Sequence, residues 1–361
     1  MQRLLKVLAL GAAASAVIAT GAYAQGGTIA KAVGGYTFED AAKESPDTKK
    51  FHSDDGQLTF AIVTHTAGNG FFDPVYVGAV TAANLVGAKI LLLGSESPTD
   101  DVVREIEILN QIIQDPTIDG LILTTPQVGA YNDIVKHMLD QGIPVATTNS
   151  FDPTIYMRDG ISHTGQSAAA AAIGGAALAK CVLDKGLDKG SILFPSQTTA
   201  GNVEVNNRVV AAFDQTVKDL NAAGKLANFT VDAGPEKIGI AVNDQDIPGS
   251  IVTLIESRGD VVGIFGPNGA VTPAIVTAIS QLGKEGQICA FGYDLGPPIL
   301  EGLKSGALTG SLGQQPFLQG FWPVMQLYLQ IDRGVAAANL DTRAQVVTKD
   351  NVGTVGKRFE N

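Results

Sequence analysis

From residue 57 onward, short apolar runs alternate regularly with amphipathic stretches of helical length. Such an alternation is typical of parallel strands joined by crossover helices. It therefore predicts an α/β fold in which helices cover both faces of mainly parallel sheets. The predicted strands cover residues 58–64, 89–93, 120–124, 144–147, 191–194, 228–231, 261–265, 288–292 and 309–312.

The predicted helices lie between these strands, and two of them have clear starts. Asp73-Pro74 places a capping carboxylate before a proline at the first helical position, and Thr99-Asp100-Asp101 predicts a capped helix with an acidic first turn. The remaining predicted helices cover residues 131–141, 167–184, 206–223, 248–257, 271–282, 297–305 and 317–334.

The 361-residue chain is longer than one hydrophobic core usually holds, so two lobes are expected. A repeat supports this expectation, because the sequence DGLILTTP at residues 119–126 is echoed by DVVGIFGP at residues 260–267. Each segment is followed by a predicted helix and by another apolar strand. Chance similarity between apolar strands is the alternative explanation.

The first 24 residues have the features of a cleavable signal peptide. Arg3 and Lys6 precede an apolar stretch, and Ala22-Tyr23-Ala24 offers small residues at a cleavage site. The remaining chain is expected to be exported to the periplasm and to be soluble, without membrane insertion. Residues 25–56 match neither the strand nor the helix pattern and are interpreted as an N-terminal extension.

Charge and motif content exclude several classes of function. The net charge of −11 disfavours nucleic acid and anionic lipid as partners. His52, His65, His137 and His163 lack the paired spacing of zinc sites, and the chain has neither a GxxxxGK[ST] phosphate loop nor a G-x-S-x-G nucleophile elbow. No catalytic residue, metal or cofactor is predicted, although an acid–base pair assembled from distant loops stays an alternative.

The two cysteines allow two interpretations. In an oxidising compartment a disulfide between Cys181 and Cys289 would persist. Cys181, however, falls on an Ala-rich helix pattern and Cys289 inside an apolar strand pattern. Two buried, unbridged side chains are therefore the favoured interpretation.

Planar polar side chains lie just past the ends of predicted strands, where ligands bind in open α/β sheets. They are Asn69, Asn149, Asn268, Asp294 and Gln314. Amides and carboxylates together donate and accept hydrogen bonds, as the closely spaced hydroxyls of a sugar or polyol require. Each residue alone could instead cap a helix or form a turn, but their joint placement favours a binding site.

Three further side chains are candidates for the same site. Phe71 and Phe72 follow Asn69 and could stack on the C–H face of a sugar ring, with core packing as the alternative. His65 ends the first strand, where a ligand contact and a hydrogen-bonded loop histidine are both open. Trp322 is expected in the core rather than in the site.

Four short motifs occur in a characteristic order, and they are Asn69-Gly70-Phe71-Phe72, Gly266-Pro267-Asn268, Gly292-Tyr293-Asp294 and Gly313-Gln314-Gln315-Pro316. In these motifs the chain resembles the type I periplasmic sugar-binding proteins of ABC transporters, such as ribose-binding protein. Their lobes also form the effector domains of lac-repressor-type regulators. The likeness runs from about residue 58 to residue 347.

The resemblance implies two doubly wound lobes joined by a three-strand hinge, with the ligand in the cleft between them. Lobe 1 would comprise residues 57–162 and 314–345, and lobe 2 residues 163–313 and 346–361. The crossovers would fall near residues 161–165, 312–315 and 344–347.

The resemblance also assigns roles to the motif residues. Asn69, Phe71 and Phe72 would contact the ligand from lobe 1, Asn268 and Asp294 would do so from lobe 2, and Gln314 would lie at the hinge.

Two departures from the family pattern concern the ligand. Asn149-Ser150 stands where ribose-binding relatives carry an Asp-Arg pair. The arginine expected after Gly201 has three competing positions, so Asn207 and Arg208 are both kept as ligand-binding candidates beside Asn206. The resemblance therefore implies a neutral polyol, another aldose or a furanose rather than ribose.

The function implied is that of a monomeric, non-enzymatic solute-binding protein, which closes at its hinge around a neutral carbohydrate or polyol. The expected partner is an ABC transporter permease, with a chemoreceptor as a further candidate.

The alternatives are an exported enzyme, a transcription regulator, and the same fold binding a signalling furanose, a nucleoside or an amino acid. The export signal and acidic charge disfavour a regulator. The loop at residues 65–69 lacks a cationic clamp for an amino acid, although Arg208 could supply one.

Overall fold

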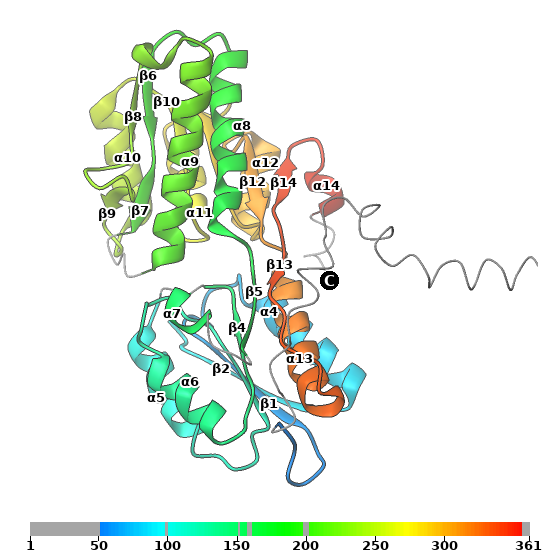
Figure 1. Ribbon diagram of the computed structural model, residues 1–361. Helices are drawn as coiled ribbons and strands as arrows, with labels where there is room; N and C mark the ends of the chain where they lie inside the picture. The colour runs from blue at the N-terminus through cyan, green and yellow to red at the C-terminus, as the bar shows by residue number, and fades with distance from the viewer. Residues whose placement is uncertain (1–50, 98–99, 151, 157–160, 198–201, 356–361) are drawn as a thin grey trace, which may run out of the picture. The chain divides into compact units, whose positions relative to one another are not determined.

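A computed structural model describes residues 51–97, 100–150, 152–156, 161–197 and 202–355 of the protein (Figure 1). The predicted signal peptide and most of the predicted extension lie outside these residues. Two six-stranded sheets carry the fold of the described residues. Each sheet with its covering helices is called a lobe here, lobe 1 for the sheet that contains the first strand and lobe 2 for the other.

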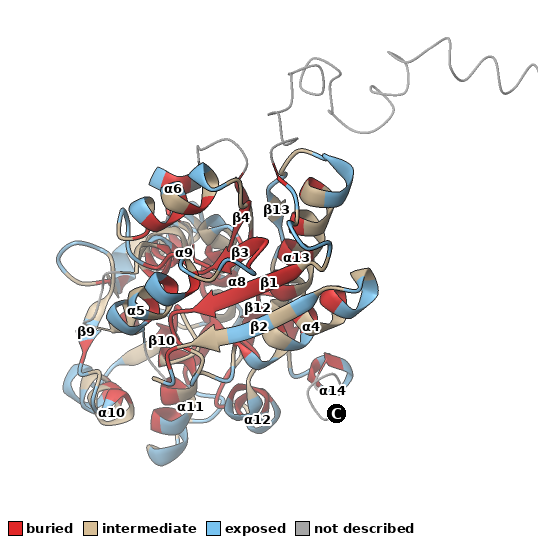
Figure 2. Cartoon of the chain, turned by 90° about the horizontal axis from the view of Figure 1, so that it is seen from below, coloured by how far each residue is buried: buried red, intermediate tan, exposed pale blue. Residues whose placement is uncertain are grey.

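The sheet of lobe 1 is parallel throughout, with the strand order β13-β5-β4-β3-β1-β2. Its strands are β1 (Thr59–Thr64), β2 (Lys89–Gly94), β3 (Gly120–Leu123), β4 (Val145–Thr148), β5 (Ile161–Gly165) and β13 (Leu340–Asp341). β1 and β3 are buried along their whole length, whereas the edge strand β2 is partly exposed (Figure 2). Burial on both faces explains why the central strands are apolar without alternation.

Helices cover both faces of this sheet. α4 (Asp73–Val86) and α13 (Pro316–Arg333) pack on one face, and α5 (Val102–Ile112) and α6 (Asn132–Asp140) pack on the other. α4 and α13 approach closely at Gly78 and Gly320, where an added Cβ would collide with the backbone of the facing helix. α13 therefore belongs to lobe 1, although it follows a strand of lobe 2 in the sequence.

The sheet of lobe 2 has the order β14-β12-β11-β10-β6-β8 and is parallel except for β14, which runs antiparallel to β12. Its strands are β6 (Gly190–Leu193), β8 (Phe229–Asp232), β10 (Val261–Phe265), β11 (Cys289–Tyr293), β12 (Gly310–Gly313) and β14 (Gln345–Thr348).

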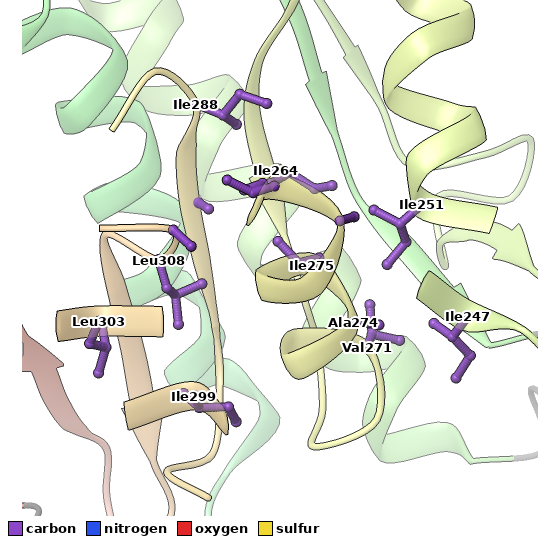
Figure 3. Close-up of a cluster of buried hydrophobic side chains, with 14 of the residues drawn as sticks. Ile247, Ile251, Ile264, Val271, Ala274, Ile275, Ile288, Ile299, Leu303 and Leu308 are labelled. Atoms are coloured by element: carbon purple, nitrogen blue, oxygen red, sulfur yellow. The ribbon is translucent and has the colours of Figure 1, made fainter. Parts of the chain in front are cut away.

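The helices of lobe 2 also form two layers. α8 (Ala171–Asp184) and α9 (Val203–Ala222) pack on one face of the sheet, and α10 (Ile247–Arg258), α11 (Val271–Gln281) and α12 (Pro297–Ser305) pack on the other. Figure 3 shows the apolar core between the lobe 2 sheet and the α10, α11 and α12 layer. In this core Ile251 comes from α10, Ile264 from β10 and Leu303 from α12. None of the helices in the described parts of the chain is long and apolar enough to cross a membrane.

The two sheets share one plan, which confirms the prediction of two similar lobes. The repeated segments form β3 and β10, and these strands hold the same place in their sheets. The apolar strands that follow them, β4 and β11, are also equivalent. The repeat in the sequence therefore corresponds to a repeat in the fold.

The chain passes between the sheets at three segments, after β5, after β12 and between β13 and β14. Hydrogen bonds join these segments to one another. Gln166 Nε2 donates to the carbonyl oxygens of Gly313 at 3.3 Å and Arg343 at 3.0 Å, and Thr342 Oγ1 donates to the carbonyl of Gln314 at 2.9 Å. The crossovers thus lie side by side, as a hinge between the lobes requires.

The nine predicted strands match observed strands to within one residue at each end. Several short elements were not predicted, because two to four residues are too few to show a period. They are β7 (Pro195–Gln197) and β9 (Ile240–Val242), which pair in a separate sheet, β13, α7 (Pro153–Tyr156), α14 (Val352–Val355) and the 3₁₀ turn η2 (Leu226–Asn228). The predicted helix at residues 167–184 is divided into the 3₁₀ turn η1 (Ala168–Ala170) and α8.

Two predicted helix starts need correction. Asp73 does not cap α4, because Phe72 before it already has helical backbone angles and Asp73 is the first helical residue. α5 is capped by Asp101, whose carboxylate accepts a hydrogen bond from the Arg104 amide at 3.0 Å. Asp100 is not the cap, and Thr99 lies outside the described residues.

Cys181 of α8 and Cys289 of β11 form a disulfide, so the interpretation of two unbridged side chains is wrong. α8 packs on the sheet of lobe 2 beside β11 and brings the two Cα atoms to 5.9 Å, a separation that suits a disulfide. The cysteines lie 108 residues apart in the sequence, and the apolar patterns around them predicted burial but not which faces meet.

Candidate binding site

A cavity lies at the carboxyl ends of strands from both lobes, where side chains of open α/β sheets meet a ligand. The lining residues of lobe 1 are His65, Thr66, Asn69, Phe71, Phe72, Asp100, Asn149 and Ser150. Gln314 lines the cavity from a crossover. The lining residues of lobe 2 are Gln197, Asn202, Glu204, Val205, Arg208, Asn268, Gly269, Ala270 and Asp294.

The turn after β1 brings an amide and an aromatic ring to the cavity. Asn69 Oδ1 accepts a hydrogen bond from the Phe71 amide at 3.0 Å, which fixes the turn. The rings of Phe71 and Phe72 meet edge to face, with centroids 5.2 Å apart. Phe72 is only 2 % exposed and packs in the lobe 1 core, whereas Phe71 is partly exposed. Phe71 is therefore the ring that is available for stacking.

Asn149 follows β4 and is fixed by its neighbours. Its Nδ2 donates to Gln319 Oε1 at 3.1 Å, and its Oδ1 accepts from Ser150 Oγ at 3.1 Å. Its backbone is left-handed, with φ of 62°, a conformation that Asn tolerates better than most residues. The side chain is thus held at the cavity wall by both its backbone and its hydrogen bonds.

Arg208 projects from α9 and, among the described residues that line the cavity, is the single arginine or lysine. It is 4 % exposed, and its guanidinium lies 4.5 Å from the centre of the Tyr293 ring. Nη2 donates to Gln314 Oε1 at 2.7 Å, and Nε lies 3.6 Å from Glu204 Oε1. Glu204 is therefore the nearest carboxylate to its charge, at ion-pair distance but without a hydrogen bond.

Asp294 follows β11 and is a buried carboxylate. Gln314 Nε2 donates to Asp294 Oδ1 at 2.7 Å, so Gln314 connects Arg208 to Asp294. Burial raises the pKa of the Asp294 carboxyl, and the charge of Arg208 partly opposes this effect. Gly269 keeps the approach open, because a Cβ there would lie 2.9 Å from Asp294 Oδ2.

Asn268 orders the start of a helix and also lines the cavity. Its Oδ1 accepts hydrogen bonds from the amides of Ala270 at 3.2 Å and Val271 at 3.0 Å, which orders the start of α11. Its Nδ2 donates to Gln197 Oε1 at 2.8 Å. Asn268 thus shapes the loop that it occupies and lines the cavity as well.

A carboxylate from lobe 1, Asp100, lies at the cavity between partners from both lobes. His65 Nε2 is 3.3 Å from Asp100 Oδ1, and Asn202 Nδ2 donates to Asp100 Oδ2 at 3.0 Å. Asn202 also caps α9, since its Oδ1 accepts from the Val205 amide at 3.3 Å. Burial opposes ionisation of Asp100, but the interactions with His65 and Asn202 hold its pKa below the usual value.

Behind His65, hydrogen bonds continue into the core of lobe 1. His65 Nδ1 lies 2.8 Å from Thr124 Oγ1, which is 2.7 Å from Glu105 Oε1, and Tyr131 donates to Glu105 Oε2 at 2.6 Å. Burial raises the pKa of Glu105 to about 7. Burial also opposes protonation of His65, but the carboxylates of Asp100 and Glu105 outweigh it and raise the His65 pKa.

The structure brings together all of the residues that the sequence singled out for the site except Asn206 and Asn207. His65, Asn69, Phe71, Phe72, Asn149, Arg208, Asn268, Asp294 and Gln314 line the cavity. Asn207 does not, because it is exposed on α9 while Arg208, one residue further along the helix, turns inward. Trp322 is partly buried on α13 against Phe321 and lies outside the cavity lining.

Several lining residues were missed by sequence reasoning. Asp100 was interpreted as part of a helix start, because a carboxylate before an amphipathic run is the usual sign of a cap. Gln197 ends β7, a strand that was not predicted, and Asn202 and Glu204 lie at the start of α9, ahead of the predicted helix start at residue 206. In the described parts of the chain, no group of three His, Cys, Asp or Glu side chains is arranged to hold a metal ion.

Two proteins similar to this chain in sequence are named as sugar-binding proteins. The chain is 25 % identical over 304 residues to a xylose/arabinose-binding protein of Sulfolobus acidocaldarius, covering 80 % of this chain and 71 % of that protein. It is 26 % identical over 267 residues to a ribose import binding protein of Haemophilus influenzae, covering 73 % and 82 %.

Solved structures share the fold. A solute-binding protein of Agrobacterium vitis, bound to alpha-D-tagatopyranose, matches with a TM-score of 0.71 at 20 % identity, covering 84 % of this chain and 99 % of that one. One from Agrobacterium radiobacter, in complex with D-arabinose, matches with a TM-score of 0.69 at 22 % identity, covering 84 % and 98 %. A family model described as a periplasmic binding protein domain matches residues 60–334. Since this match spans most of the chain and both sheets, the protein belongs to the periplasmic binding protein domain family.

Proposed function

We propose that the protein captures a neutral sugar or polyol in the cavity between its lobes and delivers it to the permease of an ABC transporter. The observation that supports this proposal most is that amide and carboxylate side chains line the same cavity as the partly exposed ring of Phe71. Asn69, Asn149 and Asn268 supply amide groups, Asp294 is a buried acceptor, and Phe71 presents its ring. Vicinal hydroxyls act as donor and acceptor at once, so they match such a lining.

The charges in the cavity favour a neutral ligand over an acidic one. Asp100, Glu204 and Asp294 line the cavity, against which stand Arg208 and the titratable His65. Arg208 is engaged by Glu204 and Gln314, so it is poorly placed to clamp a ligand carboxylate. This argues against an amino acid or a sugar acid as the ligand.

The names of the relatives support the same class. The two relatives by sequence are named for binding xylose and arabinose and for importing ribose, and the two structures hold tagatose and arabinose. These are small neutral carbohydrates. The departure at Asn149-Ser150 keeps ribose itself out of the proposal, which covers aldoses, ketoses and polyols of similar size.

In the proposed mechanism, the lobes close about the three crossovers when a ligand contacts both of them. A ligand that makes contacts only in the closed form shifts the population toward that form. A permease would then recognise the closed form, and a chemoreceptor is a further candidate partner. We place the protein in the periplasm as a monomer, exported by residues 1–24, and propose that it releases its ligand unchanged rather than acting as an enzyme.

A thermal-shift experiment tests the proposal. Refolded protein, residues 25–361, is melted with D-xylose, D-arabinose, D-ribose, D-tagatose, D-allose, xylitol, adenosine and L-leucine. A ligand that binds only the folded state at about 100 times its Kd stabilises by about 2.7 kcal/mol, which is a clear rise in Tm. We expect a stereoselective rise with one sugar or polyol.

Two outcomes contradict the proposal. A flat response to every carbohydrate with a shift for adenosine or L-leucine would assign another ligand class to the cavity. Chemical conversion of the bound sugar, seen by chromatography of the recovered ligand, would make the protein an enzyme.

A further inference from the structure

Lobe 1 carries a cavity carboxylate that the sequence motifs did not reveal. Asn149-Ser150 stands where the resemblance implies an acid and an arginine, so this strand end supplies no charge. Asp100, from the segment between β2 and α5, lines the same cavity. About a third of its side chain, 33 %, is exposed, whereas His65 beside it is 4 % exposed.

Asp100 has acceptor capacity left for a ligand. A carboxylate has about four lone-pair positions. One oxygen faces His65 Nε2 at 3.3 Å, and the other accepts from Asn202 Nδ2 at 3.0 Å. These two contacts fix the carboxylate from opposite lobes, and the remaining lone-pair positions can accept hydrogen bonds from ligand hydroxyls.

We propose that Asp100 is a specificity-determining residue, which accepts hydrogen bonds from hydroxyls of the captured sugar, and that His65 is its positioning residue. This inference rests on the proposed function and adds a contact to it. Since an ionised carboxylate only accepts, Asp100 selects for a free hydroxyl at one position of the ligand and against a deoxy or O-methyl group there.

The hydrogen bonds behind His65 and the Asp100 carboxylate in front of it together favour Nε2 as a donor in two arrangements. When Glu105 is ionised, Thr124 donates to it and accepts from Nδ1–H, and the carboxylate of Asp100 opposite Nε2 favours the imidazolium, which also donates from Nε2. When Glu105 is protonated, it donates to Thr124, which donates to Nδ1 of a neutral ring, and the ring proton sits on Nε2. Asp100 therefore meets a donor, and its orientation is kept in both cases.

The test compares affinities by calorimetry for D-xylose, D-arabinose, D-ribose and D-tagatose. We expect Asp100→Ala to lower the affinity for the tightest-binding of these sugars at least about tenfold, because a charged hydrogen-bond acceptor is lost. Glu107→Gln is the matched control, since this exposed carboxylate on α5 pairs only with surface Arg104 among its described contacts. It should change the affinity less than about twofold.

A second experiment distinguishes a direct contact between Asp100 and the sugar from a purely structural role of Asp100. The monodeoxy analogues of the tightest sugar are titrated into wild type and Asp100→Ala. One analogue should bind wild type far more weakly than the parent sugar, and Asp100→Ala should remove most of that difference. His65→Phe should reduce it as well, whereas His65→Gln, which keeps a side-chain donor, should restore part of it.

The outcomes distinguish this inference from the proposed function. Suppose that wild type binds a sugar and that Asp100→Ala has the same affinity and the same preference for the sugar over its deoxy analogues. This result overturns the role of Asp100 but leaves the proposed function intact. Equal discrimination in His65→Phe and wild type overturns the role of His65. Wild type that binds none of these sugars, and neither D-allose nor xylitol, contradicts both the proposed function and this inference.

Discussion

Asn149 and Asp294 occupy equivalent places in the two lobes, each directly after a strand and each with a left-handed backbone, with φ of 62° and 73°. They follow β4 and β11, which correspond in the two sheets, and both line the cavity. Left-handed backbone is costly for L-residues, but Asn and Asp tolerate it best. Such conformations cluster at binding sites, where the surrounding structure holds them in place.

This relationship predicts how two substitutions of Asn149 should differ in stability. Both Asn149→Gly and Asn149→Ala lose the hydrogen bonds to Gln319 and Ser150. Only Asn149→Ala keeps a Cβ in the left-handed conformation, so it should be less stable than Asn149→Gly by about 1 kcal/mol. Urea unfolding of the two variants measures the difference, and equal stability would contradict this account of the turn.

The disulfide should contribute to stability without acting on the site. Replacing Cys181 and Cys289 together by Ala should lower the free energy of unfolding by about 2–5 kcal/mol, because the bond closes a long loop in the unfolded chain. Neither cysteine lines the cavity, so the affinity for sugar should stay within about threefold. Unchanged stability of the double variant would contradict the prediction.

Glu105 should make the protein less stable as the pH rises through neutrality. Burial raises the pKa of its carboxyl from 4.5 to about 7, so the folded state binds a proton more readily than the unfolded state. The contribution is complete below pH 4.5 and is lost as the pH rises through 7. Glu105→Gln keeps a similar shape but does not titrate. Between pH 5 and pH 8, wild type should therefore lose more unfolding free energy than this variant in urea titrations.

His163 should have the opposite effect. Burial lowers the pKa of its imidazole from 6.5 to about 4, with partial opposition from Asp341. The unfolded state then binds a proton more readily, so the contribution is present above pH 6.5 and is lost as the pH falls toward 4. His163→Gln should flatten the decline in stability between pH 7 and pH 4.5. An unchanged decline would show that other groups cause it.

The sequence predicted the strands well because their burial on both faces leaves continuous apolar runs. It could not predict the pairing of Cys181 with Cys289, which depends on how α8 lies on the sheet of lobe 2. Nor could it predict β7 and β9, whose three residues each show no period. These features depend on tertiary packing rather than on local pattern.

The site was predictable where it follows a strand and less so elsewhere. Asn149, Asp294 and Gln314 were found because strand ends mark the ligand-binding edge of a parallel sheet. Asp100 was taken for a cap, since a carboxylate before a helix has that role in most sequences. The choice between Asn207 and Arg208 needed the rotation of α9, because adjacent helical residues face directions about 100° apart.

We propose that a neutral carbohydrate binds where Gln314 donates to Asp294 at the cavity wall. Calorimetric titration of wild type, Asp294→Asn and the exposed control Asp350→Asn, with the sugar that raises the Tm most, tests this site. We expect one site per chain, a loss of about tenfold to hundredfold in affinity for Asp294→Asn, and no change for the control. Equal affinity in wild type and Asp294→Asn, or no binding of any neutral sugar to wild type, would contradict it.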